Sequence, residues 1–149
     1  MALCEAAAFY KNRGLTLWDQ MINIYEKYGY YKEGLASITL KGIDGVEKIK
    51  SIMNNLRKSR LVEIASWKVK AIRDYESKTR VDINGNETEL TLPKSNVLYY
   101  ELDNNAWVCV RPSGTEPKIK FYMGVVGNSI NDAEQKLEEL KQEVIKLGQ

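Results

Sequence analysis

The segment Arg111-Pro112-Ser113-Gly114-Thr115-Glu116-Pro117-Lys118 gathers groups that can bind an anion. The guanidinium of Arg111 is a planar fork that matches two phosphate oxygens, and Ser113 and Thr115 offer hydroxyls. Gly114 can adopt positive φ and lets a ligand approach the backbone closely, so that successive amides can surround an anion. These residue types at this spacing predict a site for a phosphate group.

The other residues of the segment are expected to shape it. Pro112 fixes its own φ and stiffens the entry to the loop. Lys118 and Lys120 share one face of the strand that follows and add positive potential, and Lys118 is the weaker candidate for direct binding. Glu116 is expected to shape the turn or to pair with Lys118. From the residues alone, a rigid strand connection whose hydroxyls bond its own backbone remains an equal alternative.

The composition excludes several classes of active site. A length of 149 residues predicts one domain, or one domain with part of another. The chain is 44% hydrophobic and 28% charged, as is typical of a globular protein. It has no histidine, which excludes a Ser–His–Asp triad, a Cys–His pair and a histidine zinc site within this chain. A net charge of +2 does not by itself predict binding to nucleic acid or to a membrane.

The sequence offers no signal for a membrane or for export. No run approaches the ~20 apolar residues that a membrane helix needs. The start, Met1–Glu5, lacks a basic region followed by an apolar stretch, so no signal peptide is expected. Cys4 and Cys109 stand far apart and are expected to be buried thiols in a reducing compartment. The expected location is therefore the cytoplasm.

The hydrophobic pattern predicts an α+β fold that places the anion-binding segment between two strands. Strand patterns joined by short turns favour an antiparallel sheet with two helices on one face, and two further helices precede this unit. The expected strands are 35–41, 67–75, 97–102, 106–110 and 118–126, with a surface hairpin over 79–92 around Asn84-Gly85. The expected helices are 2–12, one capped by Thr16, one capped by Asp44 and one capped by Ser129.

The N-terminal part raises two further expectations. The helix over 2–12 has no N-cap residue, as at the cut end of a longer chain. Its apolar face over 3–10 is expected to fold back on the domain, to associate with a second copy or to fray. The segment Tyr30–Gly34 is expected to be hinge-like, and a domain-closing rotation is expected about 31–34.

The anion-binding segment, with Ile119-Lys120-Phe121-Tyr122 after it, closely resembles the signature of the C-terminal domain of the α-D-phosphohexomutases, the phosphoglucomutase/phosphomannomutase family. Residues 92–98 and 103–107 resemble the strand pair that comes just before this loop in the family, and residues 25–31 and 40–45 resemble the junction of the third and fourth domains in its bacterial phosphoglucomutase branch. The resemblance covers nearly the whole chain and is weakest over 79–91. It implies a TATA-box-binding-protein-like domain, with an antiparallel sheet of four or more strands and two helices on one face.

The resemblance also implies a division of the chain and a set of ligands. Residues 1–32 would be the helical tail of the preceding sugar-phosphate mutase domain, and residues 33–149 the C-terminal phosphate-binding domain. The substrate phosphate would be bound by Arg111, Ser113, Gly114, Thr115 and Lys118. No catalytic residue and no metal ligand is expected in this chain, because the phosphoserine loop, the aspartate-rich magnesium loop and the sugar-reading loop of the family are not found in it.

For the whole enzyme, the resemblance implies interconversion of hexose 1-phosphate and hexose 6-phosphate through a phosphoserine and a bisphosphorylated sugar. Magnesium and glucose 1,6-bisphosphate are implied for the full-length enzyme and no cofactor for this chain, which is not expected to catalyse the reaction alone. The implied partners are glucose 1-phosphate or glucose 6-phosphate and the other domains of the parent enzyme, with no nucleic acid and no membrane. Glucose, mannose and a pentose all remain open as the sugar.

A non-catalytic anion- or RNA-binding α+β module is the alternative. Cations gather in Arg57-Lys58-Ser59-Arg60 and at Lys68, Lys70 and Arg73, and Trp67 could stack a base. The simpler interpretation is a helix C-terminus whose cations suit the helix dipole, followed by an ordinary strand.

Overall fold

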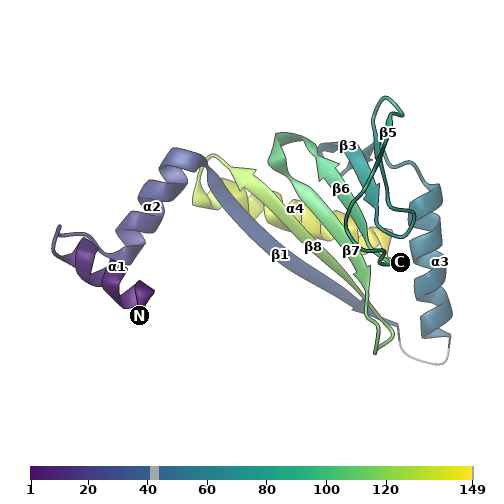
Figure 1. The fold of residues 1–149 in the computed structure, drawn as a ribbon, viewed down its shortest axis with the longest axis horizontal. Helices are drawn as coiled ribbons and strands as arrows, with labels where there is room; N and C mark the ends of the chain where they lie inside the picture. Colours follow the sequence, from purple (N-terminus) through teal and green to yellow (C-terminus); the bar gives the residue numbers. More distant parts are fainter. Residues whose placement is uncertain (41–43, 149) are drawn as a thin grey trace.

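The computed structural model describes residues 1–40 and 44–148, in which four α-helices accompany one antiparallel sheet (Figure 1). The helices are α1 (Ala2–Lys11), α2 (Leu17–Tyr28), α3 (Gly45–Lys58) and α4 (Ile130–Leu147), with a 3-10 turn at Asp103–Asn105. The strands are β1 (Tyr30–Thr39), β2 (Glu63–Ile64), β3 (Trp67–Asp74), β4 (Thr79–Asp82), β5 (Glu87–Glu89), β6 (Leu98–Leu102), β7 (Trp107–Pro112) and β8 (Lys118–Gly127).

The sheet confirms the expected α+β class. Its strands lie in the order β1-β8-β7-β6-β3-β4-β5, and β2 pairs with β3 outside this path. Helices α3 and α4 pack on one face, where the C-terminal end of α4 meets α3 over the end of β1. The other face carries no helix from the α3–α4 layer, and it is called the open face below.

Alternation along the strands builds the core between the sheet and these two helices. Ile119, Phe121 and Met123 of β8 are fully buried on the helix side, while the residues between them are half-buried. From the helices, Met53 of α3 and Leu140 of α4 are buried to the same degree. Burial of side chains of this size stabilises by about 1.5–3 kcal/mol each, so this layer is the main source of stability.

Two helix starts differ in how they are capped. At α4, the Ser129 hydroxyl accepts a hydrogen bond from the Asp132 amide at 3.1 Å, as expected from the sequence. Asp44 precedes α3 as expected, but its side chain makes no capping hydrogen bond because its backbone is itself helical, with φ −76° and ψ −8°. The expected capping role of Asp44 is therefore wrong.

The expected hinge is also wrong. Tyr30–Gly34 forms the first half of β1, paired in register with Gly127–Met123 of β8. A rotation about 31–34 would break this ladder, so the segment is a rigid connection to the sheet. The strand expected over 35–41 is the second half of β1, and its last expected residue, Lys41, lies outside the described residues.

Helices α1 and α2 project away from the sheet at the far end from α3 (Figure 1). Neither helix buries a residue, although α2 has the complete capping box predicted at Thr16, with Asp19. Cys4 on α1 is consequently exposed, and Cys109 on β7 is half-buried, so the expectation of two buried thiols is wrong. No helix among the described residues has the length and apolar character needed to cross a bilayer.

Candidate anion-binding loop

The loop Ser113–Pro117 joins β7 to β8 and is fixed at its base by backbone hydrogen bonds. The Ser113 amide donates to the Lys118 carbonyl at 2.7 Å. The Leu40 amide, just beyond β1, donates to the Pro117 carbonyl at 2.9 Å. Three separate parts of the chain therefore hold the loop, as a preorganised ligand site requires.

The tip of the loop keeps its donors free. Within the described residues, the amides of Gly114, Thr115 and Glu116 donate to no backbone or side-chain acceptor. The hydroxyls of Ser113 and Thr115 likewise make no hydrogen bond to the described chain, and neither oxygen is buried without a partner. The alternative in which these hydroxyls satisfy the loop's own backbone is not what the geometry shows. Consecutive free amides are the arrangement in which backbone dipoles attract an anion.

Two cations lie next to each other beside the loop. Arg111 of β7 and Lys120 of β8 are direct cross-strand partners on the open face. Among the described residues neither forms an ion pair with an acid. Like charges directly opposite each other on a sheet are unfavourable. The pair is thus a local source of positive potential that an incoming anion would neutralise.

Lys118 is in a different situation. Its Nζ lies 3.0 Å from Glu116 Oε2, the pairing that the sequence analysis considered for Glu116. The hydrogen bond from Lys118 lowers the pKa of the Glu116 carboxyl, with a weaker contribution from Lys120. Lys118 is therefore already partly neutralised, whereas Lys120, which sequence reasoning credited only with potential, is not. The position of Glu116 in space distinguishes Lys118 from Lys120, and the alternation of residues along the strand does not reveal that position.

A cavity of about 390 Å³ lies on the other side of the loop, against α3. Ser113, Gly114 and Thr115 line it together with Lys50 and Asn96, whereas Arg111 and Lys118 do not. Of the five expected site residues, the structure thus brings three together at the cavity and leaves two on the open face at the base of the loop. Its other lining residues are Val46, Ile49, Pro112, Glu116 and Pro117.

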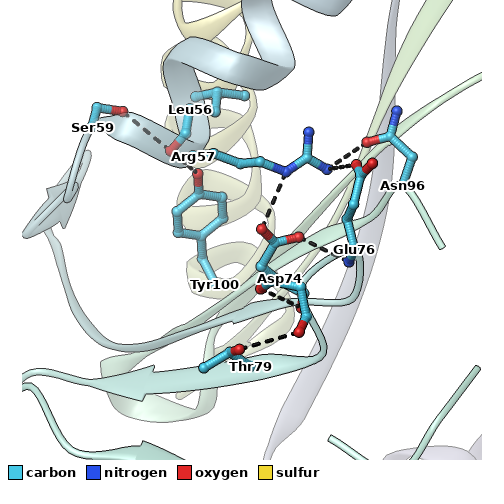
Figure 2. Close-up of polar contacts among 9 residues, drawn as sticks. Leu56, Arg57, Ser59, Asp74, Glu76, Thr79, Asn96 and Tyr100 are labelled. Carbon is cyan, nitrogen blue, oxygen red and sulfur yellow. Dashed lines mark hydrogen bonds and ion pairs between the residues drawn. The ribbon is translucent and has the colours of Figure 1, made fainter. Parts of the chain in front are cut away.

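Asn96 had no sequence signal for a site. Its Oδ1 accepts a hydrogen bond from Arg57 Nη2 at 2.5 Å, as Figure 2 shows. Since a guanidinium only donates, this contact fixes the amide orientation and leaves the Asn96 NH₂ group as a free donor among the described contacts.

Gly114 differs from its expectation. Positive φ occurs at Gly14, Gly29 and Gly85 but not at Gly114, so the loop does not need glycine for its conformation. A Cβ placed on Gly114 would meet nothing within 4 Å. The remaining physical reason for glycine is the open space over the free amides.

Two further residues are unsuited to a role in a functional site. Trp67 is 5% exposed and belongs to the core, so it cannot stack a base, and the RNA-binding alternative loses its aromatic residue. Burial raises the pKa of the Cys109 thiol, which disfavours the thiolate form that a nucleophile needs.

Comparison with known proteins adds an independent finding. A family model described as phosphoglucomutase/phosphomannomutase, C-terminal domain, matches residues 49–147. A protein named phosphoglucomutase from Staphylococcus saprophyticus is 37% identical over 134 residues, which cover 87% of this chain and 24% of that protein. Another, from Staphylococcus aureus, is 38% identical over 136 residues, which cover 91% of this chain and 24% of that protein. The chain spans about a quarter of the length of these curated relatives.

Proposed function

Because this chain belongs to the phosphoglucomutase/phosphomannomutase family, we propose that its 111–118 segment binds the phosphate group of a hexose phosphate. The observation that carries this proposal is the set of free donors at the loop tip, the amides of Gly114, Thr115 and Glu116, beside an Arg111–Lys120 pair that has no acidic partner among the described residues. A phosphate dianion supplies what both features lack, hydrogen-bond acceptors and negative charge.

The proposed ligands are Arg111, Ser113, Gly114, Thr115 and Lys118, to which we add Lys120. Arg111 supplies a bidentate fork, Ser113 and Thr115 supply hydroxyls, and Gly114 supplies an amide with open space above it. Lys118 contributes less than Lys120 because Glu116 already neutralises it. The role of this set is to hold and orient the phosphate that is not reacting, which is electrostatic and positional work.

The chemistry of the proposed reaction depends on groups outside this set. We propose that the phosphoserine and the magnesium ion belong to other parts of the full-length enzyme, and that glucose 1,6-bisphosphate is its intermediate. Among the described residues, no group of three metal-binding side chains lies together, so no step is assigned to a metal here. The chain by itself is proposed to bind substrate without turning it over.

The same proposal assigns the two parts of the chain to different domains of the enzyme. Residues 1–32 would be the tail of the preceding sugar-phosphate mutase domain, which is supported by the absence of any buried residue on α1 or α2. Residues 33–149 would be the phosphate-binding domain. The proposed partners are glucose 1-phosphate or glucose 6-phosphate and the other domains of the enzyme, in the cytoplasm.

Titration with glucose 6-phosphate, followed by backbone amide NMR shifts, tests this function. We expect saturable shifts at 113–118, at weak affinity because much of the ligand stays in water. Arg111→Ala should weaken binding about tenfold, the size of one charged hydrogen bond, without lowering the melting temperature, because Arg111 is exposed and lies opposite the like charge of Lys120.

Two lysine variants form a matched pair for the same titration. Lys120→Met should weaken binding more than Lys118→Met, although both residues lie on the same face of β8 and are two positions apart. Lys120→Met should also raise stability slightly, since it removes the like charge opposite Arg111. If the loop amides of the unchanged chain show no saturable response, the proposed function is wrong.

A further inference from the structure

A second cavity, of about 370 Å³, lies at the C-terminal end of α3, whereas the cavity beside the 113–117 loop lies against the N-terminal half of that helix. Helices α3 and α4 pack mainly on β1 and β8, so the helix-side face of β3 and β4 extends past them. The end of α3 and the segment 60–62 border this uncovered part of the sheet. The cavity shares no lining residue with the one beside the 113–117 loop.

The walls of this cavity are mostly apolar. Ile72 of β3 and Val81 of β4 are register partners that form its floor, next to the buried Val69 and Leu98. Val62 and Ile83 are 72% and 66% exposed and also belong to the lining, so apolar surface continues out to the opening. Such a hollow favours a ligand with an apolar body.

The inner polar wall is already satisfied. Figure 2 shows Arg57 at the centre of a cluster, with Nε 3.2 Å from Asp74 Oδ2 and Nη2 2.8 Å from Glu76 Oε2. The hydroxyls of Ser77 and Thr79 donate to backbone carbonyls. These groups have little capacity left for a ligand, so the inner end does not select for a polar body.

The acidic residue Asp82 is satisfied as well. Its carboxylate accepts hydrogen bonds from the amides of Asn84 and Asn86 and from the Asn86 side chain, which close the β4–β5 turn. Among the lining charges, four have no ion-pair partner in the described part of the chain, namely Arg60, Lys70, Asp82 and Glu87, and of the two carboxylates Asp82 is occupied by these amide hydrogen bonds. These two cations and two carboxylates balance in total charge, but Arg60 and Lys70 form no ion pair or side-chain hydrogen bond in the described part of the chain, so their donors are free for an anionic group.

The position of Lys70 has a structural cause. The pairing of β3 with β6 shifts register between Val69 and Ala71, so Lys70 has no register partner on β6. Irregularities of this kind redirect a side chain, and they are enriched next to functional sites. Lys70 lies at this shift and is one of the residues that line the cavity.

We propose that this cavity binds a small amphiphile with an apolar body and a single carboxylate or similar anionic head, which Arg60 and Lys70 recognise. The body would lie over Ile72 and Val81, with the head at the opening. This site is independent of the proposed phosphate site, because neither its residues nor its preferred ligand is the same.

The probe for the test is octanoate, titrated into the 149-residue chain and followed by methyl NMR. We expect saturable shifts of the Val69, Ile72 and Val81 methyls. The double variant Arg60→Gln, Lys70→Gln should weaken octanoate binding about three- to tenfold. Both residues are exposed, so the variant should fold normally. Lys68→Gln is the matched control, since Lys68 is an exposed lysine of the same strand outside the cavity, and it should bind as the unchanged chain does.

Titrations with two further ligands, 1-octanol and inorganic phosphate, test whether the anionic head and the apolar body are both needed for binding. If Arg60 and Lys70 bind the anionic head group, neutral 1-octanol should bind to the unchanged chain more weakly than octanoate does. Its affinity should then be the same for the unchanged chain and for the double variant. Inorganic phosphate should leave these methyls unshifted. The proposal is overturned if octanoate moves only residues of α1 and α2, if the shifts never saturate, or if the double variant binds octanoate as tightly as the unchanged chain.

Discussion

Glu101 is a carboxylate on the open face that pairs with two arginines. Its Oε1 lies 2.5 Å from Arg73 Nε and 2.7 Å from Arg80 Nε, and its Oε2 accepts from Arg80 Nη2 at 2.8 Å. The hydrogen bonds from Arg80 and then Arg73 lower the pKa of Glu101 to about 2, against the opposing effect of burial. Arg73 and Arg80 are themselves cross-strand partners, so Glu101 neutralises two like charges that would otherwise repel each other.

The lowered pKa predicts a specific pH dependence. The folded chain binds fewer protons at Glu101 than the unfolded chain, so this contribution is fully present above pH 4.5, the ordinary value, and is lost as pH falls towards 2. We expect Glu101→Gln to lower the free energy of unfolding at pH 7 by on the order of 2 kcal/mol, a figure discounted for the solvent that screens the partly exposed arginines. Urea unfolding across this pH range measures it.

A variant of a second carboxylate, Glu139, serves as the control for Glu101→Gln. Glu139→Gln changes an exposed residue of α4 that forms no ion pair among the described residues, and it should leave the acid limb of the stability curve as it is. An equal acid dependence in the Glu101→Gln variant and the unchanged chain would show that the ion pairs of Glu101 with Arg73 and Arg80 contribute nothing to stability.

Gly114 and Gly127 are expected to have different roles, the first in ligand binding and the second in packing. A Cβ on Gly114 meets nothing within 4 Å, whereas a Cβ on Gly127 would lie 2.4 Å from the backbone nitrogen of Ala133. We expect Gly114→Ala to keep the melting temperature and to weaken glucose 6-phosphate binding by crowding the free amides. Gly127→Ala should instead cost about 3 kcal/mol or more, because α4 must move off the end of β8. Thermal unfolding and the phosphate titration measure both effects, and a Gly114→Ala variant that binds normally would remove Gly114 from the proposed ligand set.

At the scale of elements, α2 and α4 begin with the same hydroxyl-to-amide capping bond but differ in what they contribute to the fold. The Thr16 hydroxyl accepts from the Asp19 amide at 3.1 Å, and the Ser129 hydroxyl accepts from the Asp132 amide at 3.1 Å. Each cap contributes about 1 kcal/mol to its own helix. Because α2 buries nothing while α4 covers the sheet, only the second cap should contribute to the stability of the whole domain.

Alanine variants of the two caps test this difference. Thr16→Ala should increase amide exchange within α2 and leave the main unfolding transition unchanged. Ser129→Ala should lower that transition, with a loss of about 1 kcal/mol. The idea of an independent α2 fails if both variants shift the main transition equally.

The same elements show what a sequence pattern can and cannot predict. Alternation along Lys118–Gly127 and the Asn84-Gly85 turn predicted β8 and the β4–β5 hairpin, because strand faces and tight turns depend on neighbouring residues. The hinge expected at Tyr30–Gly34 is wrong because the strand character of this segment depends on pairing with residues far along the chain. The two-residue β2 was missed for the same reason.

The candidate loop shows the same limit at the level of single groups. The donor types at Arg111, Ser113 and Thr115 are legible in the sequence, so the loop was predicted. Which donors are free, and which lysine is neutralised by Glu116, depends on three-dimensional positions, as does the orientation of Asn96 by Arg57.

At the scale of the whole molecule, α1 and α2 present apolar side chains that no other described part of the chain covers. Leu3, Phe9, Trp18, Met21 and Tyr28 are between 42% and 72% exposed. Apolar side chains gathered on two adjacent helices mark a surface that another part of a protein covers. In the proposed full-length enzyme that cover is the preceding domain, and in this chain alone the surface is open to a second copy.

We therefore expect this chain to self-associate as concentration rises, through α1 and α2 and without involving the sheet. Light scattering across a concentration series measures it, and the double variant Leu3→Glu, Trp18→Glu should be monomeric with an unchanged melting temperature, since neither residue is buried. Leu92→Glu, which changes a comparably exposed leucine outside these helices, should associate as the unchanged chain does. A monomer at every concentration, with α1 and α2 protected from amide exchange, would contradict this expectation, because ordered apolar helices would then persist with no cover at all.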